Sequence, residues 1–130
     1  LSAARRALFE AGVSPAEVAW VSAHATSTRF NDAMEAAALR NVFGDRAPPV
    51  HGAKPVTGHT LGASALLEVA LCVEVLRRRT RPPTHTPRAR DPSLAWLTVD
   101  TAPAPLDGAC VLSLNAAMAG HNTALVLGAP

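Results

Sequence analysis

The chain has 130 residues, of which 48% are hydrophobic and 17% charged, and its formal net charge is +2. This size and composition suit one soluble α/β domain with its own core and leave no room for a second domain. The basic residues are scattered apart from the run 77–81, which is too short to indicate nucleic-acid binding. The longest apolar stretch, 61–76, contains Glu68 and Glu74, which predicts a buried helix and not a membrane span.

The first two elements are predicted from their capping residues and their apolar pattern. Segment 2–12 predicts a helix with Ser2 as its N-cap and Gly12 at its C-terminal end. Because Leu1 falls in what reads as the first turn, we expect a fragment of a longer protein or a truncated reading frame, and no signal-peptide pattern opens the chain. The apolar segment 18–23 predicts a strand buried on both faces, as parallel strands are.

A second helix is predicted over 31–44. Asp32 is its expected cap, Glu35 stands in the capping-box position, and Gly44 ends it. A short strand is expected within 48–55.

The longest helix is predicted from about residue 60 to residue 79. It is apolar nearly all round, which indicates burial between two layers. Pro82 and Pro83 are expected to stop it, and an irregular connection follows over 81–96.

The last third of the chain predicts strands. The segment 97–100 reads as one strand, and 109–115 and 122–128 read as an antiparallel pair around the loop 116–121. The whole layout predicts a mixed β-sheet with helices on its faces, which is an α/β fold.

Two histidines stand where α/β folds often place chemistry. His24 follows the strand 18–23, at the carboxyl end where open α/β sheets bind ligands. His59 lies at the start of the predicted long helix, where the helix dipole disfavours an imidazolium and favours a neutral hydrogen-bond donor. Either could instead be structural: His24 hydrogen-bonded among small polar residues, His59 in a glycine-rich helix start.

Lys54 is the only lysine in a chain with eleven arginines. It indicates a need for a compact ammonium with a titratable proton. The sequence contains no clustered metal ligands and no serine elbow, which argues against a metal protein or a hydrolase. We expect His121 to be structural and assign no role to two further histidines, His51 and His85.

The chain resembles the C-terminal half of a β-ketoacyl-acyl carrier protein synthase, of the thiolase superfamily, over two segments: AHATSTRFNDAMEAAALRNVFG and KPVTGHTLGASALLEVAL. Three spacings carry the resemblance: eleven positions from His24 to Glu35, thirty from His24 to Lys54, and five from Lys54 to His59. It implies that residues 1–130 form the C-terminal half of a thiolase-like fold, without the N-terminal half. The residue pattern of both segments further resembles that of ketosynthases of aryl polyene pathways.

The resemblance also implies an activity. Enzymes of this family are acyltransferases of fatty acid or polyketide-type biosynthesis, which condense a cysteine-bound acyl group with malonyl-acyl carrier protein as carbon dioxide leaves. It implies that His24 and His59 donate hydrogen bonds to the malonyl thioester oxygen and stabilise the enolate. Lys54, paired with Glu35, would balance the charge. Substrate binding is implied for two hydroxyls and one backbone N–H: Thr26, Thr28 and Met118.

The expected cofactors and partners follow from the same resemblance. No metal or redox cofactor is implied, because phosphopantetheine arrives on the acyl carrier protein. The expected partners are that carrier protein and an N-terminal ketosynthase half or partner ketosynthase subunit, with a dimer when complete; nucleic acid and membrane are not expected. The location is expected to be cytoplasmic, since Cys72 and Cys110 lie in apolar segments as reduced thiols. An isolated half should expose an apolar face of its long helix.

The chain also departs from the family pattern. The family's nucleophilic cysteine lies in the absent half, and Cys72 and Cys110, as core thiols, cannot replace it, so the chain alone is expected to be inactive. Met118 stands where a phenylalanine is expected. Alanine cannot take a positive φ cheaply, yet it replaces three family glycines: Ala25, Ala117 and Ala119. An alternative therefore stays open, a non-catalytic, chain-length-factor-like or degenerate scaffold subunit of a ketosynthase complex.

Overall fold

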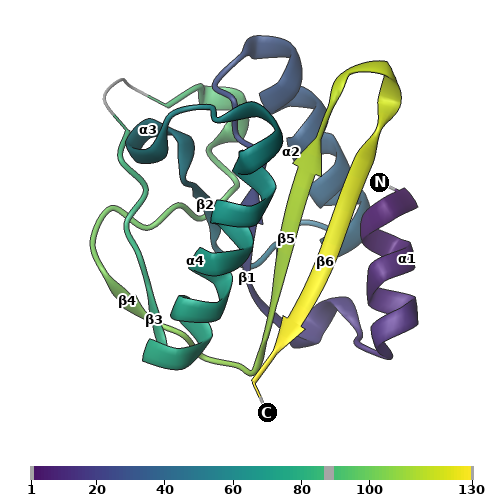
Figure 1. Ribbon diagram of the computed structural model, residues 1–130, viewed down its shortest axis with the longest axis vertical. Helices are drawn as coiled ribbons and strands as arrows, with labels where there is room; N and C mark the ends of the chain where they lie inside the picture. The colour runs from purple at the N-terminus through teal and green to yellow at the C-terminus, as the bar shows by residue number, and fades with distance from the viewer. Residues whose placement is uncertain (1, 87–89, 130) are drawn as a thin grey trace.

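The computed structural model describes residues 2–86 and 90–129, and their helices and strands alternate along the first half of the chain (Figure 1). In chain order they are α1 (Ser2–Ala11), β1 (Val18–Ala23), α2 (Arg29–Phe43), β2 (Val50–Gly52), α3 (Lys54–Thr57), α4 (Ser64–Arg78), β3 (Thr80–Arg81), β4 (Ala104–Pro105), β5 (Cys110–Ala116) and β6 (Asn122–Gly128).

Four strands form one mixed sheet in the order β2-β1-β5-β6. The central strand β1 runs parallel to β2 and to β5, while β5 and β6 form an antiparallel pair. The predicted mixed sheet is confirmed, and so are the buried strand over 18–23 and the closing pair. Parallel strands place their carboxyl ends at one edge of a sheet, and this edge carries the site described below.

Helices cover both faces of this sheet (Figure 1). Trp20 and Val111 are fully buried on the face that packs against α4, with Cys72 and Val75 of that helix. The next residues along the two strands point the other way, because side chains alternate along a strand, and they pack with residues of α1 and α2. The sheet therefore has two cores, one on each face.

The second helix begins earlier than predicted. Thr28 is extended and its hydroxyl accepts from the N–H of Asn31, so it caps a helix that starts at Arg29. Asp32 is therefore not the cap and Glu35 is not in a capping box, and both expectations were wrong. Gly44 ends the helix with a φ of 67°, as predicted.

The first helix differs from its prediction only at its start. Ser2 is itself helical, and Leu1 lies outside the described residues. Gly12 follows the helix with a φ of 65°, which fits the predicted C-terminal position.

The long helix is shorter than predicted, since α4 begins at Ser64. A short helix, α3, and a 3₁₀ turn, Leu61–Ala63, occupy the segment before it. Leu61 has a φ of 51°, which interrupts the helix, and Arg79 in the left-handed region ends it before the two prolines. One face of α4 is buried, while Leu66 on the other is 73% exposed, in line with the expected exposed apolar face.

The strand predicted over 97–100 was wrong. This segment makes single backbone hydrogen bonds, from Val50 N–H to the carbonyl of Thr98 and from Thr84 N–H to the carbonyl of Asp100, both 2.8 Å, and no ladder. The predicted irregular connection over 81–96 contains the 3₁₀ turn Pro92–Leu94, and its residues 87–89 lie outside the described part of the chain. No helix in the described ranges is long and apolar enough to cross a membrane.

Candidate active site

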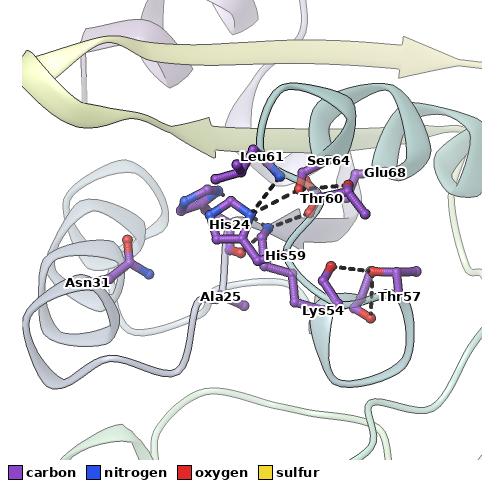
Figure 2. Close-up of polar contacts among 12 residues, drawn as sticks. His24, Ala25, Asn31, Lys54, Thr57, His59, Thr60, Leu61, Ser64 and Glu68 are labelled. Carbon is purple, nitrogen blue, oxygen red and sulfur yellow. Dashed lines mark hydrogen bonds and ion pairs between the residues drawn. The ribbon is translucent and has the colours of Figure 1, made fainter.

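The candidate site lies where β1 and β2 end side by side. His24 directly follows β1, and Lys54 is the first residue of α3, two positions after β2. Since Ala23 and Gly52 are register partners at the ends of these parallel strands, the two side chains start from the same edge. His59 enters from the segment that joins α3 to α4 (Figure 2).

The rings of His24 and His59 face each other edge to face, with centroids 5.5 Å apart and an interplanar angle of 85° (Figure 2). We expected the two imidazoles to lie close enough to reach one oxygen, and this proximity is confirmed. Their chemical role is a separate question that rests on which ring nitrogens carry protons.

His24 is 7% exposed, and its Nδ1 lies 3.4 Å from the ammonium of Lys54, which also donates to the backbone carbonyl of His24. An ammonium has only protons to offer, so Nδ1 accepts and the proton of the neutral ring is on Nε2. Burial and then the positive charge of Lys54 lower the pKa of His24, although Glu35, a hydrogen bond with the side chain of Asn115, and Glu68 act the other way. The neutral form of His24, which this lowered pKa favours, therefore carries its proton on Nε2.

His59 reaches the same tautomer by another route. The backbone N–H of Leu61 donates to its Nδ1 at 3.2 Å, which puts the proton of the neutral ring on Nε2. The neutral donor predicted from the sequence is consistent with this geometry, but the reason differs. The helix α4 begins five residues later, so the local N–H of Leu61 acts where we had expected the helix dipole to act.

Lys54 pairs with Glu68 and not with Glu35, so the expected partner was wrong. Its ammonium lies 2.6 Å from Oε1 of Glu68, and the two side chains are 6% and 2% exposed. Glu68 is on the second turn of α4, where its carboxylate faces the start of α3 (Figure 2). Sequence reasoning missed this residue, although a carboxylate inside an apolar helix is a signal for a buried partner.

Glu35 instead holds the backbone at the end of β1. Its two carboxylate oxygens accept from the N–H groups of His24 and Ala25, both at 2.7 Å. The side-chain amide of Asn31 donates to the same carboxylate at 2.7 Å. These bonds fix the path of the chain at the point where His24 leaves the strand.

That path is strained. Ala25 has a φ of 43° and Ser27 a φ of 58°, both in the left-handed region that favours glycine. A Cβ at Gly52 would lie 2.9 Å from the Cβ of Ala25, so glycine at 52 makes room for alanine at 25. The alanine at this family glycine position thus adopts the positive φ despite its cost.

The expected substrate-binding residues are placed as follows. The hydroxyls of Thr26 and Thr28 are 3.4 Å apart in the loop before α2, and Thr28 also caps that helix. Met118 is 92% exposed in the 3₁₀ turn Met118–Gly120 between β5 and β6. Ala117 is extended, with a φ of −133°, whereas Ala119 has a φ of 60°.

Only one of the two cysteines is a core thiol. Cys72 is fully buried, and burial raises its pKa to about 12. Cys110 is partly exposed, which corrects the expectation that both are in the core. A thiol that stays protonated is a poor nucleophile, so Cys72 does not fit a covalent role.

Taken together, the site brings two imidazoles, each with its neutral-form proton on Nε2, to a centroid distance of 5.5 Å beside a buried ion pair. Two donors of this kind suit an oxyanion that forms during a reaction. Among residues 2–86 and 90–129, no group of three or more His, Cys, Asp or Glu side chains is placed to hold a metal ion.

Comparison with known proteins supplies the family. Residues 1–87 match the family model described as the beta-ketoacyl synthase C-terminal domain. The chain is 33% identical to the 3-oxoacyl-[acyl-carrier-protein] synthase 2 of Mycobacterium bovis, over 95% of this chain and 30% of that protein. It is 38% identical to nodulation protein E of Rhizobium leguminosarum bv. trifolii, over 95% of this chain and 31% of that protein.

The fold agrees with solved structures. The ketosynthase ApeO, solved with its chain length factor ApeC from Xenorhabdus doucetiae, superposes with a TM-score of 0.90 and 37% identity, over 98% of this chain and 32% of that one. A beta-ketoacyl synthase from Burkholderia phymatum superposes equally well, with a TM-score of 0.90 and 34% identity, over 97% of this chain and 31% of that one. The expected thiolase-like α/β fold is confirmed. The chain spans about 30% of the length of the curated relatives it matches.

Proposed function

We propose a function from the premise that this chain belongs to the β-ketoacyl synthase family, whose C-terminal domain it matches. Its function is to supply the two enolate-stabilising histidines of a β-ketoacyl-acyl carrier protein synthase. The observation that carries the proposal is the edge-to-face pair His24 and His59, in which each Nδ1 is an acceptor, so that the neutral form of each ring carries its proton on Nε2.

The chemistry follows from that pair. When a malonyl thioester loses carbon dioxide, the electron pair of the breaking bond moves toward the thioester carbonyl, whose oxygen becomes an enolate. Two N–H donors aimed at this oxygen stabilise the charge as it forms, and they do so more strongly in a site that excludes water. The resulting carbon nucleophile then attacks the carbonyl carbon of an acyl thioester on the nucleophilic cysteine of the other part; a new carbon–carbon bond forms, the carbon–sulfur bond breaks, and the cysteine thiolate leaves.

Charged groups around the pair keep it in this state. The ammonium of Lys54 donates to His24 and forms an ion pair with Glu68. The lysine therefore places a positive charge near the histidines, and the carboxylate of Glu68 balances that charge. Glu35 fixes the backbone from which His24 projects. In this proposal Thr26 and Thr28 bind the phosphopantetheine arm, and the backbone N–H of Met118 faces the acyl thioester.

The proposed partners are an acyl carrier protein and a second ketosynthase part that carries the nucleophilic cysteine. Relatives of which this chain spans about 30% contain the rest of such a protein. The cytoplasm is the proposed place of action.

One observation favours a second candidate function. Ala25 and Ala119 hold positive φ values at family glycine positions, and an exposed Met118 stands at a family phenylalanine position. These departures fit a chain-length-factor-like or scaffold subunit that keeps the fold and pairs with an active ketosynthase. The intact His24, Lys54 and His59 favour the catalytic reading.

The rate of malonyl decarboxylation distinguishes the catalytic function from the scaffold function. The chain is combined with an N-terminal ketosynthase part, and carbon dioxide release from malonyl-acyl carrier protein is measured for wild type, His24→Ala and His59→Ala. Loss of one oxyanion donor is expected to lower the rate roughly a hundredfold to a thousandfold. His85→Ala, which removes an exposed histidine, is the matched control. A rate unchanged in both site variants would contradict the catalytic function and favour the scaffold.

A further inference from the structure

Ser64 contacts the His59 ring at its Nδ1 atom. Its hydroxyl lies 3.2 Å from Nδ1 of His59 and 3.2 Å from the hydroxyl of Thr60 (Figure 2). Ser64 is the first residue of α4 and is 4% exposed, whereas Thr60 lies at the surface. A buried hydroxyl with two polar neighbours has a defined orientation, and here that orientation can be worked out.

The direction of each hydrogen bond is set by Leu61. Its backbone N–H can only donate, and it donates to Nδ1 of His59, so this nitrogen carries a lone pair. The hydroxyl of Ser64 must then donate to Nδ1 as well. Its own oxygen is left to accept, and the hydroxyl of Thr60 is the donor beside it.

The backbone at Leu61 is held in a conformation that leucine disfavours. Its φ is 51°, yet its side chain is 77% exposed, so burial of the leucine does not offset the strain. Leu61 and Ser64 both lie 3.2 Å from Nδ1, and both present protons to it.

We propose that Ser64 is a positioning residue for His59, with its hydroxyl oriented by Thr60. The chain of bonds from Thr60 to Ser64 to Nδ1 holds the ring in the Nε2–H tautomer and turned toward His24. A proton on Nδ1 would conflict with the N–H of Leu61, so the arrangement keeps His59 a hydrogen-bond donor. Its consequence for turnover rests on the proposed function, whereas its effect on the ring does not.

The test is nitrogen NMR of the chain labelled with ¹⁵N-histidine at neutral pH. In the wild type the His59 Nδ1 resonance is expected at the position of an unprotonated, hydrogen-bonded nitrogen. Ser64→Ala is expected to move it toward the position of a nitrogen with fewer donors, and Thr60→Val to move it less far in the same direction, because hydrogen bonds in a chain strengthen one another. Ser64→Thr, which keeps a hydroxyl, is expected to restore it.

Ser113→Ala is the matched control, since it removes a buried hydroxyl that has no hydrogen-bond partner among the described residues. A Nδ1 resonance that stays at its wild-type position in Ser64→Ala would overturn the proposal. So would a Ser64→Thr variant displaced as far as Ser64→Ala, because packing and not the hydroxyl would then be responsible. If Ser64→Ala does not fold, Thr60→Val at the surface decides by the same resonance.

A second readout links the ring to turnover. In the assembled enzyme, Ser64→Ala is expected to lower malonyl decarboxylation about fivefold, as one net hydrogen bond is worth, with Ser64→Thr recovering the rate. If the His59 Nδ1 resonance moves in Ser64→Ala but the wild-type assembly does not decarboxylate malonyl-acyl carrier protein, Ser64 remains a positioning residue. Only the proposed function is then contradicted. If the wild-type assembly is active but the His59 Nδ1 resonance does not move in Ser64→Ala, only the role of Ser64 is contradicted.

Discussion

The ammonium of Lys54 and the carboxylate of Glu68 form an ion pair that is almost completely buried, with 2.6 Å between Nζ and Oε1. The other carboxylate oxygen, Oε2, is buried without a hydrogen-bond partner in the described residues. Bringing two charges out of water is costly, and their mutual attraction offsets that cost only while both are present. The pair thus ties the start of α3 to α4 and holds the lysine beside His24.

Removing Lys54 is expected to destabilise the chain strongly. In Lys54→Met the carboxylate of Glu68 stays buried without its cation, which costs about 3–5 kcal/mol in the free energy of unfolding. Urea denaturation measures this loss. The control is Arg6→Met, which breaks the pair of Arg6 and Glu10 and is expected to cost far less, because both side chains are exposed to solvent. Equal losses in the two variants would contradict this account, and a Lys54→Met/Glu68→Leu chain should recover part of the stability.

Cys72 is not expected to accept an acyl group. It is fully buried with a pKa raised to about 12, so its thiolate is scarce near neutral pH. Mass spectrometry of the folded chain after exposure to an acyl-thioester donor should show no adduct on Cys72. The unfolded chain, alkylated at both thiols by a small reagent, shows that each can be detected. A stable acyl group on Cys72 would contradict the assignment of this residue to the core.

The arginine cluster at the end of α4 is expected to contribute little to carrier-protein docking. Arg77 and Arg78 both pair with Glu74, which reduces the charge they present to a partner. Arg78→Glu in the assembled enzyme should therefore lower turnover at low salt by less than about tenfold, equivalent to about 1.4 kcal/mol. Arg6→Glu on α1 is the comparison for a general change of charge. A larger loss that excess carrier protein relieves would show that the cluster steers docking.

The sequence allowed the three central residues of the site to be predicted, but not how they are connected. His24, Lys54 and His59 could be found because parallel strands end at one edge and the spacings matched a family pattern. The partner of Lys54 could not, because Glu35 and Glu68 are both carboxylates within reach in principle. Which one faces the ammonium depends on the direction of α3, a short helix that no pattern indicated.

The predictions of the N-cap of α2 and of a strand over 97–100 failed for a similar reason. Thr28 and Asp32 are both good N-caps, and the choice depends on how soon the chain turns after β1. The segment 97–100 has the apolar pattern of a strand but forms only isolated backbone bonds, so periodicity alone overestimated it. The sequence pattern assigns no role to Ser64, because its hydroxyl acquires one only through the position of the His59 ring.

His51 is expected to make the chain less stable in mild acid. It is 5% exposed, its ring lies 5.4 Å from that of Trp20, and its Nδ1 is 2.9 Å from the hydroxyl of Thr84. Burial lowers its pKa from 6.5 to about 4, against a smaller opposing effect of Asp100. Between these two values the unfolded chain binds a proton at His51 that the folded chain does not, so stability falls as the pH falls through this window.

The size of this effect can be measured against a variant. Between about pH 7 and about pH 5, His51 is expected to account for about 2 kcal/mol of the loss in the free energy of unfolding, at about 1.4 kcal/mol per pH unit. His51→Gln should lose this share of the pH dependence, and His85→Gln, at an exposed position, should keep it. His24, whose pKa is also lowered, leaves a remaining dependence of the same sign in both variants. Parallel pH profiles for wild type and His51→Gln would contradict the assignment.

Ala25 and Gly52 are expected to be energetically coupled. A Cβ at residue 52 would meet the Cβ of Ala25 at 2.9 Å, a distance that real side chains avoid, so one of the two strand ends must move in Gly52→Ala. Overpacking of this kind costs about 1–3 kcal/mol. Ala25→Gly alone removes that Cβ and also relieves the positive φ of 43°, so it should leave stability nearly unchanged or raise it by about 1 kcal/mol.

The double variant Ala25→Gly/Gly52→Ala tests the coupling directly. With the Cβ of residue 25 gone, the new Cβ at residue 52 has room, and the cost of Gly52→Ala should largely disappear. The free energies of unfolding of the four chains, measured by urea denaturation, then give an interaction of about 1–2 kcal/mol. Because Glu35 holds Ala25 through its N–H, a strand end displaced in Gly52→Ala should also disturb His24 and lower decarboxylation in the assembled enzyme. Additive free energies in this double-mutant cycle would mean that the strand ends accommodate the extra Cβ without strain. The close approach of residues 25 and 52 would then not determine the position of His24.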